Sequence, residues 1–188
     1  QRVARKLDLL LDDLGRRLEA TRWPSPAREG WALGTDRDWL GSLVDYWRNH
    51  FDWRAQETWL NETLPGQRVA LRGLDIHFVE IASGRPDAIP LLLLHGWPSS
   101  FVEMHRLAPL LASPGHFGAS EDDAFDIVVA SLPGHGFSSA PEDPAFGADD
   151  AADCLRDLMV DVLGHDRFAV HGGDRGAFVA TGIAHRHP

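Results

Sequence analysis

The chain has 188 residues, which is enough for one domain of ordinary size and too few for two large ones. Hydrophobic residues make up 44% of it and charged residues 24%, a balance typical of folded globular proteins that excludes disorder over the whole length. Because 18 lysines and arginines face 28 aspartates and glutamates, the net charge of −10 argues against a protein that binds nucleic acid or a membrane surface through basic residues.

Cysteine content and hydropathy bear on the compartment. The single cysteine, Cys154, cannot form a disulfide within the chain. The longest apolar stretch, around Ile89–Leu94, is too short to cross a bilayer, and Gln1 opens a charged, helix-like segment rather than a signal peptide. We therefore expect a cytoplasmic protein without membrane contact.

Three helices are predicted in the first third of the chain. Leucines at three- and four-residue spacing predict an amphipathic helix near the N-terminus: Leu7, Leu10, Leu11, Leu14 and Leu18. Residues 24–35 contain proline, glycine and serine and are predicted to form a loop. Thr35 or Asp36 is the candidate N-cap of a second helix that runs to Asn49, and a short third helix is predicted over residues 54–62. Six of the seven tryptophans lie in this region, and we expect them to pack against a large apolar surface.

Strand-like composition begins after Gly66, with a turn predicted at Gly73. The predicted strands are Val69–Leu71, Ile76–Ile81, Ile89–Leu94, Asp126–Ala130 and Phe168–Val170. The predicted helices between and after them are Phe101–Leu111, Ala148–Leu163 and Ala177–His185. Continuous apolar runs suit strands buried on both faces of a parallel sheet, and strand–helix alternation predicts an α/β fold. The predicted fold class is thus a mostly parallel sheet flanked by helices, preceded by a tryptophan-rich helical segment.

One motif lies at the last predicted strand-to-helix turn, where Gly172-Gly173-Asp174-Arg175-Gly176 has a small residue two places before and after a central side chain. This spacing is typical of a nucleophile elbow, which lifts its central residue above the sheet beside the positive end of the next helix. Here the central residue is a carboxylate, which attacks saturated carbon by displacement without a base to activate it. Asp174 is therefore a candidate nucleophile.

Two other interpretations of this motif exist. Asp174 can instead serve only as the N-cap of the following helix, and the motif alone does not decide between nucleophile and cap. A dinucleotide-binding loop would need glycine where the chain has His171, which disfavours that alternative.

A second motif, His95-Gly96-Trp97-Pro98, directly follows the apolar strand that ends at Leu94. Gly96 permits a sharp turn, and Pro98 has no N–H to offer. The backbone N–H groups of Trp97 and Arg175 are candidates for a shared oxyanion hole. The alternative is a loop whose tryptophan fills space.

A third motif, Leu132–Ser138, follows another strand and is predicted to be an ordinary structural loop.

Together these residues resemble the microsomal type of epoxide hydrolase, which has the α/β-hydrolase fold. The resemblance rests on Trp47-Arg48, Phe51–Arg54, Leu60-Asn61, Gly73–Phe78, Leu94–Ser100, Ser131–Gly134 and Gly172–Asp174. It implies an N-terminal helical domain over residues 1–65 and the first half of the hydrolase core over residues 66–188. It also implies hydration of an epoxide to a vicinal diol through a covalent ester on Asp174, with Trp97 and Arg175 as backbone oxyanion donors.

The resemblance implies further properties of the protein. It implies a small-molecule epoxide substrate, no cofactor, a homodimer, and a role in detoxification or secondary metabolism. No HExxH pattern or paired-cysteine spacing predicts a metal site.

The chain departs from the family pattern in several places. Many relatives carry tryptophan where this chain has Arg175. The family uses tyrosines of a cap domain to protonate the leaving oxygen, whereas the only tyrosine here, Tyr46, lies in the leading helical part. His185 and His187 lie on or beyond the last helix and are poor candidates for the catalytic base. We therefore expect the 188 residues to be inactive by themselves. The alternatives are a haloalkane dehalogenase-like hydrolase and a non-catalytic truncated fragment.

Overall fold

The computed structural model describes residues 2–25 and 30–188, with the side chains of the first helix described from residue 7 onward. Two compact units divide the chain, Gln1–Glu57 and Thr58–Pro188. Residues 26–29 of the predicted loop lie outside the described residues. The domain boundary expected after residue 65 stays a prediction.

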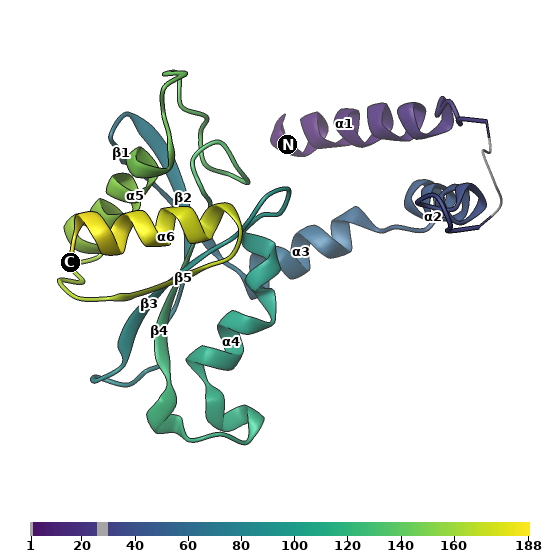
Figure 1. Ribbon diagram of the computed structural model, residues 1–188. Coiled ribbons are helices and arrows are strands. Elements are labelled where there is room, and N and C mark those ends of the chain that lie inside the picture. Colours follow the sequence, from purple (N-terminus) through teal and green to yellow (C-terminus); the bar gives the residue numbers. More distant parts are fainter. Residues whose placement is uncertain (1, 26–29) are drawn as a thin grey trace. The chain divides into compact units, whose positions relative to one another are not determined.

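The three predicted N-terminal helices are confirmed as α1 (Arg2–Glu19), α2 (Arg37–Asn49) and α3 (Trp53–Thr63) (Figure 1). Asp36, rather than Thr35, is the N-cap of α2, because its carboxylate accepts a hydrogen bond from the Trp39 N–H at 2.9 Å.

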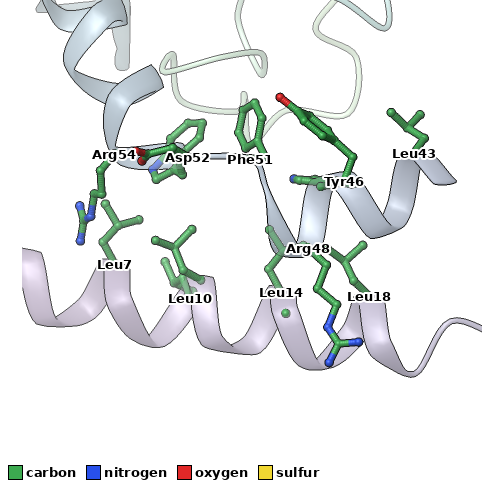
Figure 2. A pocket seen from close by; sticks show the side chains of 14 residues that line it. Leu7, Leu10, Leu14, Leu18, Leu43, Tyr46, Arg48, Phe51, Asp52 and Arg54 are labelled. Carbon is green, nitrogen blue, oxygen red and sulfur yellow. The ribbon is translucent and has the colours of Figure 1, made fainter. Parts of the chain in front are cut away.

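An apolar groove of about 900 Å³ lies between α1 and the helical segment that includes α2. Figure 2 shows the leucines of α1 pointing toward the aromatic side chains across the groove. Trp47 and Trp53 line it and are 46% and 38% exposed, and α2 and α3 contain no buried residue. An ion pair between Arg48 and Glu19 joins α2 to α1 at 3.0 Å. Trp47 and Trp53 therefore line an open apolar groove, and the expected packing of the six tryptophans against a large apolar surface stays a prediction.

The second unit is built on a five-stranded sheet with the strand order β1-β2-β4-β3-β5. Its strands are β1 (Gly66–Leu71), β2 (Leu74–Ile81), β3 (Ile89–Leu94), β4 (Phe125–Ala130) and β5 (Ala169–Gly172). β1 and β2 form a hairpin whose two connecting residues, Arg72 and Gly73, have φ angles of 50° and 78°. Two positive φ angles suit the tight turn that matches the twist of antiparallel strands, so the turn predicted at Gly73 is confirmed.

The sheet is mixed rather than mostly parallel. β2 pairs antiparallel with β1 and β4, whereas β3 pairs parallel with β4 and β5. The last strand begins at Ala169 instead of Phe168 and continues to Gly172, because its parallel register with β3 pairs Leu94 with Gly172. The predicted α/β class is otherwise confirmed.

Helices follow the predicted pattern with one correction. The segment Phe101–Leu111, predicted as a single helix, divides into a 3₁₀-helix, Phe101–His105, and α4 (Leu107–Ala112). Pro109 explains the division, since it has no N–H to bond the carbonyl of His105 and is tolerated only in the first turn of a helix.

The remaining helices are α5 (Ala148–Asp157), which continues as a π-helix over Leu158–Val162, and α6 (Arg175–Arg186). Alternating residues of the central strands pack into two separate cores. Leu92 and Leu94 pack on the side of α5 and α6, whereas Leu91 and Leu93 pack on the side of α4. Because strand side chains alternate between faces, the helices cover both faces of the sheet (Figure 1).

A buried histidine connects β2 to the loop after β4. The Nδ1 atom of His77 lies 2.9 Å from the Ser131 hydroxyl, and the Ser131 N–H donates to the carbonyl of His77 at 2.9 Å. The ring of His77 packs edge-on against Phe101 and Phe137. Burial, together with a smaller effect of the nearby charge of Arg68, lowers the pKa of His77 to about 4.

This histidine makes stability depend on pH. The unfolded chain protonates His77 near its ordinary value of 6.5, whereas the folded chain does so only near 4. Between these two pH values the unfolded chain binds the proton and the folded chain does not. We therefore expect the free energy of unfolding to fall by about 3 kcal/mol as the pH is lowered from about 6.5 to about 4. Urea unfolding at several pH values checks this, with His77→Asn expected to remove that part of the pH dependence. Ser131→Ala is the matched control and keeps the dependence, because burial and not the hydroxyl causes the shift; equal slopes for the wild type and His77→Asn would contradict it.

Candidate active site

Asp174 lies in the turn between β5 and α6, with φ 50° and ψ −119°. These angles are unfavourable for a residue with a side chain. The two flanking glycines of the motif are sterically required. A Cβ atom on Gly172 would lie 2.5 Å from the carbonyl of Gly176, and one on Gly176 would lie 2.5 Å from the carbonyl oxygen of Leu94. Gly173 is different, because a Cβ there would meet nothing within 4 Å.

The carboxylate of Asp174 is held by the loop after β3. The Trp97 N–H donates to Asp174 Oδ1 at 2.8 Å. Gly96 permits this approach, since a Cβ on it would lie 2.9 Å from the Cβ of Asp174. Although Asp174 occupies the N-cap position of α6, its side chain makes no capping hydrogen bond. The carboxylate is therefore held in place by the Trp97 N–H and not by a capping hydrogen bond to α6.

The pKa of Asp174 is lowered from its ordinary value, first by the Trp97 N–H and then by the Arg175 N–H. Hydrogen bonds to the charged form favour ionisation, so the carboxylate is deprotonated at neutral pH. The side chains of Asp174, Arg175 and Trp97 are all exposed. The two backbone N–H groups are thus the main causes of the lowered pKa, and the charge of Arg175 acts in the same direction.

His95 and Pro98 flank the Gly96-Trp97 pair in different environments. His95 is completely buried, with its Nδ1 atom 2.9 Å from the carbonyl oxygen of Gly96. Pro98 is exposed and follows Trp97 in the loop. The structure therefore brings the residues of both sequence motifs together at the carboxyl ends of β3 and β5.

The third motif, predicted to be an ordinary structural loop, makes a structural contact with His95 that the sequence did not predict. The N–H of its Leu132 donates to His95 Nε2 at 3.1 Å. The loop lies at the same edge as the loop after β3, because parallel β3 and β4 both end there. His187, which the sequence marked as a poor candidate for the catalytic base, is the C-cap of α6, and its Nε2 lies 2.8 Å from Asp153 Oδ1.

Within residues 2–25 and 30–188, no three histidine, cysteine, aspartate or glutamate side chains are grouped to hold a metal ion. None of the described helices has both the length and the hydropathy to cross a membrane.

Two family models match this chain, each over more than half of its length. The model for the epoxide hydrolase N terminus matches residues 6–104, and the model for the alpha/beta hydrolase fold matches residues 89–188. The chain belongs to the epoxide hydrolase family. The resemblance and the α/β-hydrolase fold class inferred from the sequence are thereby confirmed.

Named relatives in this family are similar over nearly the whole chain. A putative epoxide hydrolase of Stigmatella aurantiaca is 43% identical, and epoxide hydrolase 1 of Sus scrofa is 37% identical; both matches cover 95% of this chain and 40% of the relative. The crystal structure of juvenile hormone epoxide hydrolase from Bombyx mori superimposes with a TM-score of 0.82 at 32% identity, covering 94% of this chain and 47% of that one. The epoxide hydrolase of Aspergillus niger gives a TM-score of 0.78 at 36% identity, covering 92% and 45%. The chain thus corresponds to the N-terminal portion of these epoxide hydrolases.

The turn angles at Asp174 predict an effect of glycine on stability. Glycine adopts φ 50° without the penalty that a Cβ imposes, so Asp174→Gly is expected to be about 1 kcal/mol more stable than Asp174→Ala. Both variants lack the carboxylate, and the comparison therefore isolates the backbone. Chemical denaturation of the two proteins measures the difference. An alanine variant at least as stable as the glycine variant would show that the turn is not strained.

The glycine contacts predict opposite outcomes for two neighbouring substitutions. Gly176→Ala places a methyl group against the Leu94 carbonyl and is expected to cost about 2–3 kcal/mol in the free energy of unfolding. Gly173→Ala, three residues earlier in the same turn, meets open space and is expected to stay within about 0.5 kcal/mol of the wild type. Thermal and urea unfolding measure both. Equal losses would mean that α6 does not pack as closely on β3 as the structure shows.

Proposed function

We propose that this chain carries the nucleophile of an epoxide hydrolase, which hydrates a small-molecule epoxide to a vicinal diol through a covalent ester on Asp174. The observation that carries the proposal is the ionised carboxylate of Asp174, fixed on a turn by the Trp97 N–H at 2.8 Å. Membership of the epoxide hydrolase family and the names of the relatives support it.

The two oxygens of the carboxylate have different roles in this proposal. Oδ1 accepts the Trp97 N–H, so Oδ2 is the oxygen that attacks an epoxide carbon. The carbon–oxygen bond of the ring breaks, and the ring oxygen takes a proton from a general acid to become a hydroxyl. This leaves a hydroxyalkyl ester on Asp174, with Oδ1 as its carbonyl oxygen.

Hydrolysis of the ester is the step in which the backbone donors act. Water adds to the ester carbonyl, and negative charge develops on Oδ1. The N–H groups of Trp97 and Arg175 stabilise that charge as an oxyanion hole; the Trp97 N–H already donates to this oxygen before the reaction, and the Arg175 N–H already acts on the same carboxyl group. Collapse of the tetrahedral intermediate breaks the ester bond and restores the carboxylate. One proton of the water passes to the departing oxygen to complete the diol, and the other returns to the general acid.

Isotope labelling in a single turnover tests this mechanism. With the full-length protein in excess over styrene oxide in ¹⁸O-water, the first diol is expected to carry unlabelled oxygen from the enzyme, and Asp174 is expected to gain the label. Mass spectrometry of the diol and of the peptide containing Asp174 measures both. Label in the first diol would indicate direct attack by water and would remove the covalent ester.

Two control variants sharpen the same experiment. Asp174→Ala is expected to abolish diol formation, whereas Asp166→Asn changes an exposed carboxylate in the loop before β5 and is expected to leave turnover unchanged. Release of halide from a haloalkane, with no diol from the epoxide, would favour the dehalogenase alternative. A folded full-length protein that does neither reaction would favour a non-catalytic role.

Three other inferences from the sequence stay predictions. These are the homodimer, the cytoplasmic location and the domain boundary after residue 65. Each is independent of the chemistry at Asp174.

A further inference from the structure

His95 is completely buried at the end of β3, and both of its ring nitrogens have backbone partners. Nδ1 lies 2.9 Å from the carbonyl oxygen of Gly96, and Nε2 lies 3.1 Å from the amide nitrogen of Leu132. A carbonyl oxygen can only accept and an amide N–H can only donate. The partners therefore assign a neutral ring, with a proton on Nδ1 that is donated to Gly96 and an unprotonated Nε2 that accepts the Leu132 N–H.

The backbone at Leu132, which binds this ring, is held in place by its neighbour. Its neighbour Ser131 is completely buried and is tied to His77 of β2 by two hydrogen bonds, one from its backbone N–H and one at its hydroxyl. By contrast, the side chain of Trp97 is 62% exposed, so packing of the indole contributes little to holding its loop. The ring of His95 is thus the buried connection between a fixed loop and an exposed one.

We propose that His95 is a positioning residue, whose neutral ring ties Gly96 to Leu132 and so directs the Trp97 N–H at Asp174 Oδ1. This inference rests on the proposed function, in which that N–H stabilises the oxyanion. His95 touches neither the substrate nor the reacting atoms. It acts through the peptide that joins Gly96 to Trp97, which carries both the carbonyl that His95 binds and the N–H that Asp174 accepts.

The surroundings of the ring support its neutral form. Burial is the main cause that lowers the pKa of His95, and the nearby ring of His135 acts in the same direction. The Gly96 carbonyl and Glu103 act in the opposite direction without reversing the shift. A proton on Nε2 would face the N–H of Leu132, so protonation would break the connection that we assign to this residue.

Nitrogen NMR of the wild-type 188-residue chain tests the tautomer without any substitution. At neutral pH, long-range ¹H–¹⁵N spectra are expected to show His95 with a protonated Nδ1 and an unprotonated Nε2. A proton on Nε2 at neutral pH, in either the other tautomer or the charged ring, would overturn the proposal.

The pKa of Asp174, followed by ¹³C NMR of its carboxyl carbon, tests the positioning itself. His95→Asn keeps a donor near the position of Nδ1 but cannot reach Leu132. We expect both His95→Asn and His95→Ala to raise the pKa of Asp174 above the wild-type value. The readout is specific, because the Trp97 N–H is the main cause of the lowered pKa. An unchanged pKa of Asp174 in folded His95→Asn would overturn the proposal.

Two matched controls separate positioning from general loosening. His135→Asn changes the neighbouring ring, whose centroid is 5.5 Å away and whose Nδ1 contacts the carbonyl of Pro133 in its own loop. Leu92→Ala opens a cavity at a completely buried position of β3 and lowers stability. Both are expected to leave the pKa of Asp174 unchanged; a shift as large as that of His95→Asn in either control would overturn the specific role of His95.

Kinetics of the full-length protein give a second readout. His95→Asn is expected to slow hydrolysis of the ester about 10²-fold, since a misplaced oxyanion donor affects this second step and not formation of the ester. The value of kcat then falls, the covalent ester accumulates, and KM falls together with kcat. An unchanged kcat would count against the proposal. Failure of the label transfer in ¹⁸O-water would instead reject the proposed function, while the tautomer of His95 and the pKa of Asp174 would still be measured independently of turnover.

Discussion

The first turn of α6 passes so close to the end of β3 that no side chain fits between the two backbones. A Cβ on Gly176 would lie 2.5 Å from the Leu94 carbonyl oxygen, and one on Gly172 would meet the carbonyl of Gly176 at the same distance. Asp174 lies in the turn between these two glycines. Its position therefore follows from backbone packing, and the strained angles of the turn are maintained by the sheet and helix on either side.

The same close packing determines the electrostatics of the carboxylate. Gly96 lets the loop after β3 approach Asp174, and the Trp97 N–H then lowers the pKa of the carboxyl group. Backbone donors keep a constant direction toward the carboxylate, because the fold itself holds them. The buried ring of His95 contacts the carbonyl of Gly96 in this exposed loop and the N–H of Leu132 in the loop after β4, and so connects the two loops.

Local sequence patterns predicted most elements, and the differences have identifiable causes. The N-cap at Asp36 and the turn at Gly73 follow from local chemistry, and both appear in the structure. The predicted helix over Phe101–Leu111 divides because Pro109 cannot continue the hydrogen-bonding pattern. β5 begins at Ala169 and not at the predicted Phe168, because the end of this strand is set by its pairing with β3, and the hydrophobic pattern of the sequence does not encode that pairing.

The sequence by itself determined the fold class and the residue types at the candidate site. Glycines on either side of Asp174, and the glycine before Trp97, are local requirements of tight turns and were therefore visible in the order of residues. Only the tertiary structure decided that the Trp97 N–H, 77 residues away, reaches Asp174, and that His95 meets Leu132. These contacts depend on the order and register of the parallel strands, which place Leu94 level with both Ala130 and Gly172. Register is a property of the assembled sheet, and no local pattern of residues specifies it.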